Sequence, residues 1–146
     1  DKILNNDEDF RAVLIEGHSD SDPYKPKEKQ DYFGVAEPTN WDLSTARASQ
    51  VVKYLIDIGV NPGKLRPSGY ADTWPYGTTW HDVVSGKVDR EYILARNSDE
   101  SFVDSNNNAR WDEEEEYTDL NKNGKYDTAA DNKENNRRIK IVFTNQ

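Results

Sequence analysis

The chain has 146 residues, a hydrophobic share of 34%, a mean hydropathy of −1.06 and a formal net charge of −9. This length suits one domain with a small apolar core. The acidic balance, without a basic stripe, disfavours nucleic-acid binding, and the absence of cysteine excludes disulfides, thiolate metal sites and a cysteine nucleophile.

The negative charge is concentrated in one segment. Residues 99–131 hold 11 acidic and 3 basic side chains, hence a net charge of −8, and the rest of the chain is almost neutral. Such a segment needs either solvent or bound cations. No apolar run is long enough to span a bilayer and no signal peptide is visible at Asp1, so we expect any membrane anchor to lie outside this chain.

The first two predicted elements are a strand and a helix. The apolar run at residues 12–15 predicts a buried strand over 10–16. Residues 43–58 predict an amphipathic helix that Asp42 or Ser44 caps and that ends before Gly59. Its apolar face consists of Ala48, Val51, Val52, Leu55 and Ile58.

Two further strands follow. Residues 64–70 predict a strand at an edge or bulge, because Pro67 cannot donate to a ladder. Residues 138–144 alternate, with Ile139, Ile141 and Phe143 on one face, and predict a final strand with one buried side. Together the elements predict an α+β fold with helices on a mixed sheet, interrupted by loops over 21–39 and about 74–133.

Four short blocks appear in order along the chain: Gly17-His18-Ser19-Asp20, then Asn40-Trp41-Asp42-Leu43-Ser44-Thr45-Ala46-Arg47-Ala48, Gly69-Tyr70 and Asn136-Arg137-Arg138. In this order and register they resemble the OmpA/MotB-like peptidoglycan-binding domain. The resemblance implies an OmpA-like two-layer sandwich over residues 1–146, as one domain. The acidic segment at about 99–131 is then an insertion before the last helix and strand.

The resemblance also implies a binding pocket for peptidoglycan. The end of meso-diaminopimelate carries an ammonium and a carboxylate, which an Asp and an Arg can bind. By the family pattern these are Asp20 and Arg47, with further contacts from Asn40, Leu43 and Arg137. We interpret His18 as structural.

This sequence departs from the family pattern in three ways. Ser19 replaces the usual Thr, and Ala71 stands where the family often has Gly. The family also places another strand and helix before the first block, whereas about fifteen residues precede it here.

The implied function is non-enzymatic: peptidoglycan binding that anchors a membrane protein to the wall from the periplasmic, extracytoplasmic side. Trp41 and the helix residues Val51, Val52, Tyr54 and Leu55 are closest to MotB-type stator subunits. Stators imply a homodimer and a membrane segment outside this chain. A lipoprotein or an outer-membrane protein tail would share the same pocket.

The acidic segment contains two calcium-binding loop patterns fifteen residues apart. Residues 104–115 match a twelve-residue EF-hand-like loop, with Ala109 where Gly is preferred, and residues 119–130 match a second loop that has Ala130 at position twelve. The missing carboxylate must come from elsewhere, such as Glu116 or Asp131. We therefore predict structural Ca²⁺ on Asp104, Asn106, Asn108, Arg110, Asp112, Glu115, Asp119, Asn121, Asn123, Lys125 and Asp127.

Three alternatives remain open. The acidic segment could be a disordered loop, the usual result of such a composition. The domain could be a calcium-dependent adhesion module, with Trp74, Tyr76 and Trp80 on its surface. A cell-wall hydrolase is disfavoured, because residues 113–116 form a charged run instead of a site that raises one carboxyl pKa.

Overall fold

The computed structural model describes residues 12–25 and 38–144, which fall into two compact units. Residues 12–25, 38–72 and 137–144 form one, here named the sheet unit, and residues 73–136 form the other, the insertion unit. The insertion unit contains the whole acidic segment. Within the described ranges, no helix is long and apolar enough to cross a membrane.

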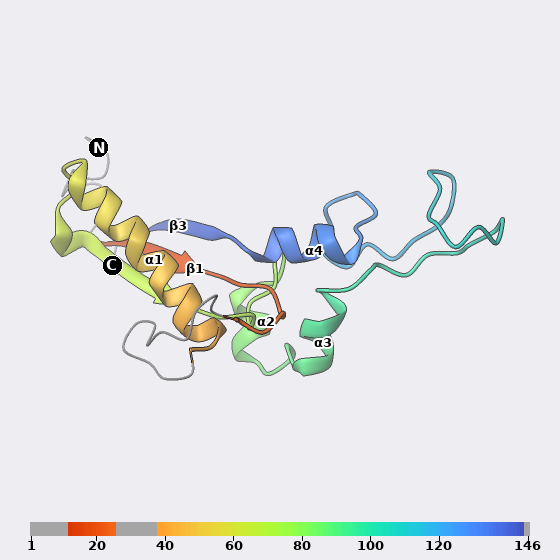
Figure 1. Ribbon diagram of the computed structural model, residues 1–146, viewed down its shortest axis with the longest axis horizontal. Coiled ribbons are helices and arrows are strands. Elements are labelled where there is room, and N and C mark those ends of the chain that lie inside the picture. Colours follow the sequence, from red (N-terminus) through yellow and green to blue (C-terminus); the bar gives the residue numbers. More distant parts are fainter. Residues whose placement is uncertain (1–11, 26–37, 145–146) are drawn as a thin grey trace. The chain divides into compact units, whose positions relative to one another are not determined.

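The sheet unit is built on a mixed three-stranded sheet in the order β2-β1-β3 (Figure 1). β1 (Ala12–Gly17) is central, β2 (Leu65–Gly69) pairs parallel with it and β3 (Ile139–Thr144) antiparallel. Helix α1 (Asn40–Asp57) and the 3₁₀ turn η1 (Pro62–Lys64) connect β1 to β2. The predicted α+β class is confirmed, and Pro67 lies in a strand at the edge of this sheet.

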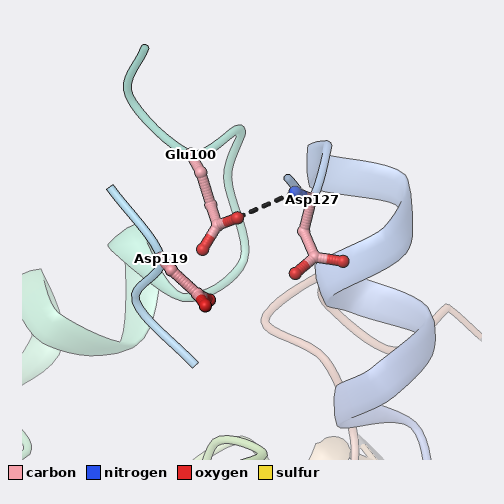
Figure 2. Close-up of side chains that lie close together, drawn as sticks. All are labelled: Glu100, Asp119 and Asp127. Carbon is pink, nitrogen blue, oxygen red and sulfur yellow. Dashed lines mark hydrogen bonds between the residues drawn. The ribbon is translucent and has the colours of Figure 1, made fainter. Parts of the chain in front are cut away.

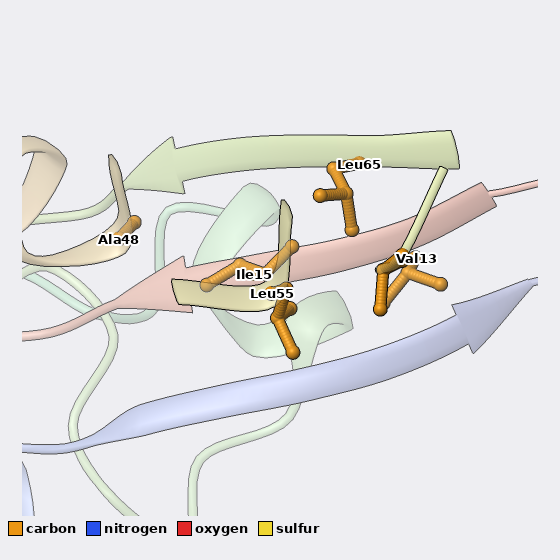
Figure 3. Packing of buried hydrophobic residues seen from close by; sticks show 6 residues of the cluster. Val13, Ile15, Ala48, Leu55 and Leu65 are labelled. Atoms are coloured by element: carbon orange, nitrogen blue, oxygen red, sulfur yellow. The ribbon is translucent and has the colours of Figure 1, made fainter. Parts of the chain in front are cut away.

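The core of the sheet unit is a small apolar cluster between α1 and the sheet (Figure 3). Its buried members are Val13, Ile15, Ala48, Leu55, Val60 and Leu65. Val51 and Val52 pack against this cluster, whereas Ile58 is 46% exposed because it is the C-cap of α1. The predicted helix face is therefore correct through Leu55 and wrong at its last position.

Helix α1 begins three residues earlier than predicted. Thr39 is the N-cap: its hydroxyl accepts from the Trp41 N–H at 3.2 Å, and Asp42 accepts from the Thr39 N–H at 2.7 Å. This reciprocal pair is a capping box. Asp42 thus contributes as the second partner, while Ser44 is buried and does not cap the helix.

The prediction that the apolar side of β3 is buried is wrong. Ile139, Ile141 and Phe143 are 38%, 42% and 52% exposed. Their register with β1 puts them on the same side of the sheet as α1. Helix α1, however, packs over β1 and β2, so it leaves this part of β3 uncovered.

The insertion unit contains three short helices, α2 (Trp80–Val84), α3 (Arg90–Ala95) and α4 (Ala129–Asn136). Polar side chains connect them to the intervening loops. The Asn136 amide donates to the carbonyl of Arg96 at 3.0 Å and accepts from the Tyr76 N–H at 2.8 Å. Asn132 likewise donates to the Ser98 carbonyl at 2.7 Å. This unit is therefore organised by buried hydrogen bonds.

Candidate functional site

Two glycines allow α1 to pack directly on the strand ends. A Cβ atom on Gly17 would clash with the Ser44 carbonyl, and one on Gly69 would clash with Thr45. Only glycine permits such a close approach of backbone to backbone. Because Gly17 ends β1, this contact places the following Asp20 beside the first turns of α1.

A pocket of about 180 Å³ lies at this point. It is lined by all five residues that the family resemblance implied: Asp20, Asn40, Leu43, Arg47 and Arg137. Five residues that the sequence analysis did not include complete the wall: Ser19, Asp22, Pro23, Tyr24 and Lys25. Pockets that bury a whole drug-sized ligand measure roughly 300–1,000 Å³. This one instead suits a smaller group, such as part of a peptide.

Asp20 is the buried anion of the pocket and is held on several sides. Its carboxylate accepts from Arg137 Nη1 at 2.6 Å and from the Asp22 N–H at 2.9 Å. The Asn40 amide donates to the carbonyls of Asp20 and Asp22, at 3.3 and 2.9 Å. Asn40 therefore ties the loop after β1 to the start of α1, and Arg137 orients the carboxylate of Asp20.

Arg47 is the exposed cation on the helix side of the pocket. It has no ion-pair partner within residues 12–25 and 38–144. A planar guanidinium in this state can donate two parallel hydrogen bonds to an incoming carboxylate. The pocket thus presents an oriented carboxylate and an available guanidinium, which suits a ligand that carries both an ammonium and a carboxylate.

A larger hollow, of about 420 Å³, follows the outer face of α1 between Trp41 and Lys53. None of the five predicted pocket residues lines it. Its Asp42 is engaged in the capping box, so the pairing of opposite charges found at Asp20 is not repeated there. We therefore place the candidate site in the smaller pocket.

His18 packs inside the sheet unit. It is 1% exposed, its Nε2 atom lies 3.2 Å from Glu16 Oε1, and its ring stacks on Tyr70 with a centroid distance of 5.3 Å. Burial, together with the positive charges of Arg138 and Lys140, lowers the pKa of His18 from 6.5 to about 3. The imidazole is therefore neutral at neutral pH.

The insertion unit holds a second candidate site, made by two loops with matching internal hydrogen bonds. In each loop the first Asp accepts from the N–H groups of the fifth and sixth residues, at 3.2 and 2.9 Å in residues 104–115 and at 3.2 and 2.8 Å in residues 119–130. The fifth side chain accepts from the seventh N–H, at 2.9 and 3.0 Å. The sixth residue has a positive φ in both, 60° at Ala109 and 77° at Gly124.

Glu100 occupies the place of the carboxylate that the second loop lacks at Ala130. In the first loop, Glu115 accepts from the N–H groups of the second and ninth residues, at 3.0 and 2.8 Å. Glu100 accepts from the equivalent groups of the second loop, at 2.7 and 2.8 Å. The suggested Glu116 and Asp131 are not in this position, and Asp131 instead accepts from Thr128 at the start of α4.

Three carboxylates converge at the second loop, from segments that are separate in sequence (Figure 2). Ligand oxygens of Glu100, Asp119 and Asp127 all lie within 4.8 Å of one another. Burial raises the pKa of Glu100, backbone hydrogen bonds lower it, and the charges of Asp127 and Asp119 raise it. A set of oxygen donors with this charge fits the preference of Ca²⁺, and a cation there would stabilise the ionised carboxylates.

The two loops are related by an approximate twofold symmetry. Phe102 and Tyr117, fifteen residues apart, form an antiparallel bridge flanked by two exchanged backbone hydrogen bonds, each of 2.8 Å. Trp111 and Tyr126, each the eighth residue of its loop, stack with centroids 5.0 Å apart. Equivalent residues of the repeat thus pack against each other and join the loops into one structure.

The sequence signal for Glu100 was present but lay upstream of the aligned repeat. Glu100 precedes the first Asp of one loop by four residues, as Glu115 precedes the first Asp of the other. In the structure each Glu serves the loop that it does not immediately precede. Extending the fifteen-residue repeat by four positions would have identified it, whereas nothing in residues 22–25 marked them as pocket residues.

The comparisons with known proteins give one family. The model of the OmpA family matches residues 1–87, more than half of the chain. This segment includes four of the five predicted pocket residues and excludes Arg137 and both acidic loops. Comparison with curated proteins and with solved structures gives no match. The chain therefore belongs to the OmpA family.

Proposed function

We propose that this domain binds peptidoglycan non-covalently, by the free end of meso-diaminopimelate in the stem peptide. Domains of the OmpA family are generally peptidoglycan-binding domains of the cell envelope and are not typically catalytic. The observation that carries the proposal is the Arg47 guanidinium, which has no ion-pair partner among the described residues, in the same pocket as the oriented Asp20 carboxylate.

The chemistry of the ligand matches these two groups. Arg47 would bind the carboxylate through its planar fork, and Asp20 would accept from the ammonium. The Asp20 carboxylate pairs with Arg137 and retains acceptor capacity, because a carboxylate has about four lone-pair sites. Lysine, which lacks the second carboxylate, would leave Arg47 unpaired and would bind more weakly.

Co-sedimentation with purified sacculi tests this function. The wild-type domain should pellet with diaminopimelate-type sacculi, and Arg47→Ala should weaken binding by about 2 kcal/mol or more, roughly thirtyfold. Lys53→Ala is the matched control, because Lys53 is an exposed cation of the same helix outside this pocket. Equal pelleting of the wild type and Arg47→Ala would contradict the assignment of the pocket.

We further propose that the domain anchors a membrane protein to the wall from the periplasmic side, and that a MotB-type stator is the machine concerned. The support for the stator is Trp41 and the sequence of α1. A stator would function as a homodimer and would carry a membrane-spanning segment outside this chain. Determining the complete sequence of the gene product tests this proposal. A hydrophobic segment with an intramembrane Asp would support a stator, whereas a lipid-acceptor Cys would support a lipoprotein.

We also propose that the insertion unit binds structural Ca²⁺. The matched hydrogen bonds of the two loops, and the position of Glu100 in the second, support two equivalent sites. The first would use Asp104, Asn106, Asn108, the Arg110 carbonyl, Asp112 and Glu115. The second would use Asp119, Asn121, Asn123, the Lys125 carbonyl, Asp127 and Glu100.

Calorimetric titration with Ca²⁺ tests this proposal. The wild type should bind two ions per chain, and Glu100→Gln should reduce the binding to one site while the first loop still binds. Glu113→Gln, which changes an exposed carboxylate outside both ligand sets, is the control. Two undiminished sites in Glu100→Gln would contradict the role of Glu100.

A calcium-dependent adhesion module is the alternative function, with the insertion unit as the binding surface. The same sacculus assay distinguishes it. Binding that survives Arg47→Ala and is lost in chelator would support adhesion through the insertion unit. Binding that is lost in Arg47→Ala supports the pocket.

A further inference from the structure

The walls of the pocket carry more positive than negative charge. Lys25, Arg47 and Arg137 line it together with Asp20 and Asp22, which gives three cations and two anions. A ligand end with one ammonium and one carboxylate is neutral and would leave this excess uncompensated. The pocket is therefore suited to a ligand end with a net negative charge.

Two of the three cations already have an assignment. Arg137 pairs with Asp20 at 2.6 Å, and Arg47 is the proposed partner of the diaminopimelate carboxylate. Lys25 is exposed and has no ion-pair partner within the described ranges. It belongs to the segment that follows β1, so it reaches the pocket from a different element than Arg47 does.

We propose that Lys25 binds a second carboxylate of the stem peptide, so that the pocket recognises two carboxylates and one ammonium. This inference rests on the proposed binding of diaminopimelate. A stem tripeptide has two further carboxylates that could serve: that of the D-glutamate and that of the C-terminus. Both share the chemistry that a lysine ammonium recognises, and amidation of either removes its charge.

Titration with synthetic stem tripeptides of L-alanine, γ-D-glutamate and meso-diaminopimelate tests the proposal. The probes are the free tripeptide, the same peptide amidated at the glutamate carboxylate, and the same peptide amidated at the C-terminus. At low salt the wild type should bind the free peptide about two- to fivefold more tightly than one of the two amidated forms, the scale of an exposed ion pair. The form that loses affinity identifies the carboxylate.

Lys25→Met should bind the free peptide more weakly than the wild type does, by the same factor. It should also bind the free peptide and that amidated form with equal affinity. Lys53→Met, which removes a lysine outside the pocket, should behave as the wild type. Raising the salt concentration should reduce the preference of the wild type for the free peptide over the amidated form. In Lys25→Met, the ratio of the two affinities should not change with salt.

Two results would overturn the inference. One is an undiminished preference in Lys25→Met, and the other is equal binding of all three peptides by the wild type. If Arg47→Ala abolishes binding in either case, the proposed function stands without the second carboxylate. If the wild type binds none of the peptides, the proposed function itself is wrong.

Discussion

The sheet unit packs an apolar core beside its buried polar side chains, whereas the insertion unit buries almost only polar ones. In the sheet unit, Val13, Ile15 and Leu65 pack with α1 in an apolar cluster, and apolar burial needs no ligand. In the insertion unit, apart from Pro75 and Ile93, the buried side chains are polar or charged: Thr78, Arg96, Asn97, Glu100, Glu115, Asn121, Asp127, Asn132 and Asn136. Buried carboxylates are costly unless a partner offsets their charge.

Because of this difference, the stability of the two units should respond to different changes. The fold of the sheet unit should depend on side-chain volume and little on ions. The insertion unit should depend on the Ca²⁺ that we propose for its two loops, because metal binding to such loops is coupled to their folding. A change that destabilises one unit should therefore leave the stability of the other unit unaltered.

Removal of calcium should have the largest effect. In chelator the carboxylates of Glu100, Asp119 and Asp127 repel one another, so the insertion unit should lose its order while the sheet unit persists. Limited proteolysis with mass spectrometry should show faster cleavage within residues 99–131, by about a hundredfold if free calcium exceeds its Kd by that factor. Equal protection of this segment with and without calcium would contradict the comparison.

A cavity in the apolar core should destabilise the sheet unit and leave the insertion unit folded. Ile15 is fully buried, so Ile15→Ala should lower the free energy of unfolding of the sheet unit by about 3 kcal/mol. The loss should be the same in calcium and in chelator. Chemical denaturation followed by amide signals of β1 measures it, with the surface change Lys53→Ala as the control. A calcium-dependent loss would show that the units are not independent.

Acid should destabilise the sheet unit through His18. Its pKa is about 3 in the folded protein, against the ordinary value of 6.5 that applies to the unfolded chain, so the unfolded chain binds the proton more readily between these values. The stability present above pH 6.5 is therefore lost as the pH falls, by about 2 kcal/mol at pH 5. Burial raises the pKa of the neighbouring Glu16, which opposes this trend in acid.

The difference between the wild type and His18→Gln isolates this contribution. Thermal melts from pH 7.5 to pH 4.5 should show a smaller loss in the variant, because its side chain does not titrate. A pH dependence as steep as that of the wild type would exclude His18 as the source.

Two alanines with positive φ should give the smallest effects. Ala71 in the sheet unit and Ala109 in the first acidic loop have φ values of 52° and 60°. Glycine tolerates this conformation, so each change to glycine should stabilise its unit by about 0.5 kcal/mol. Thermal melts should show that Ala71→Gly acts regardless of calcium and that Ala109→Gly acts on the calcium-bound insertion unit. Destabilisation by either change would contradict the backbone argument.

The sequence was sufficient to predict the elements in which the spacing of apolar residues matches the side that packs against the core. The stripe through Ala48 and Leu55 predicted α1, and the family resemblance of the blocks around Asp20 and Arg47 implied the residues of one pocket. It was not sufficient for β3, because the alternation of Ile139 and Ile141 is compatible with burial but does not say which helix covers them.

Two other features depended on contacts between distant segments. Glu100 serves a loop that begins nineteen residues after it, so the spacing within either loop does not reveal its role. Lys25 lines the pocket because the segment after β1 is tied down by Asn40. Neither contact has a local signature in the chain.

The most direct test of the central claim is calorimetric titration of the domain, in calcium, with a stem tripeptide that contains meso-diaminopimelate. The wild type and Lys53→Ala should bind it, while Arg47→Ala should bind at least about thirtyfold more weakly. The corresponding lysine-containing tripeptide should bind poorly to all three proteins. Equal affinity of the wild type and Arg47→Ala, or no preference for diaminopimelate over lysine, would contradict the account.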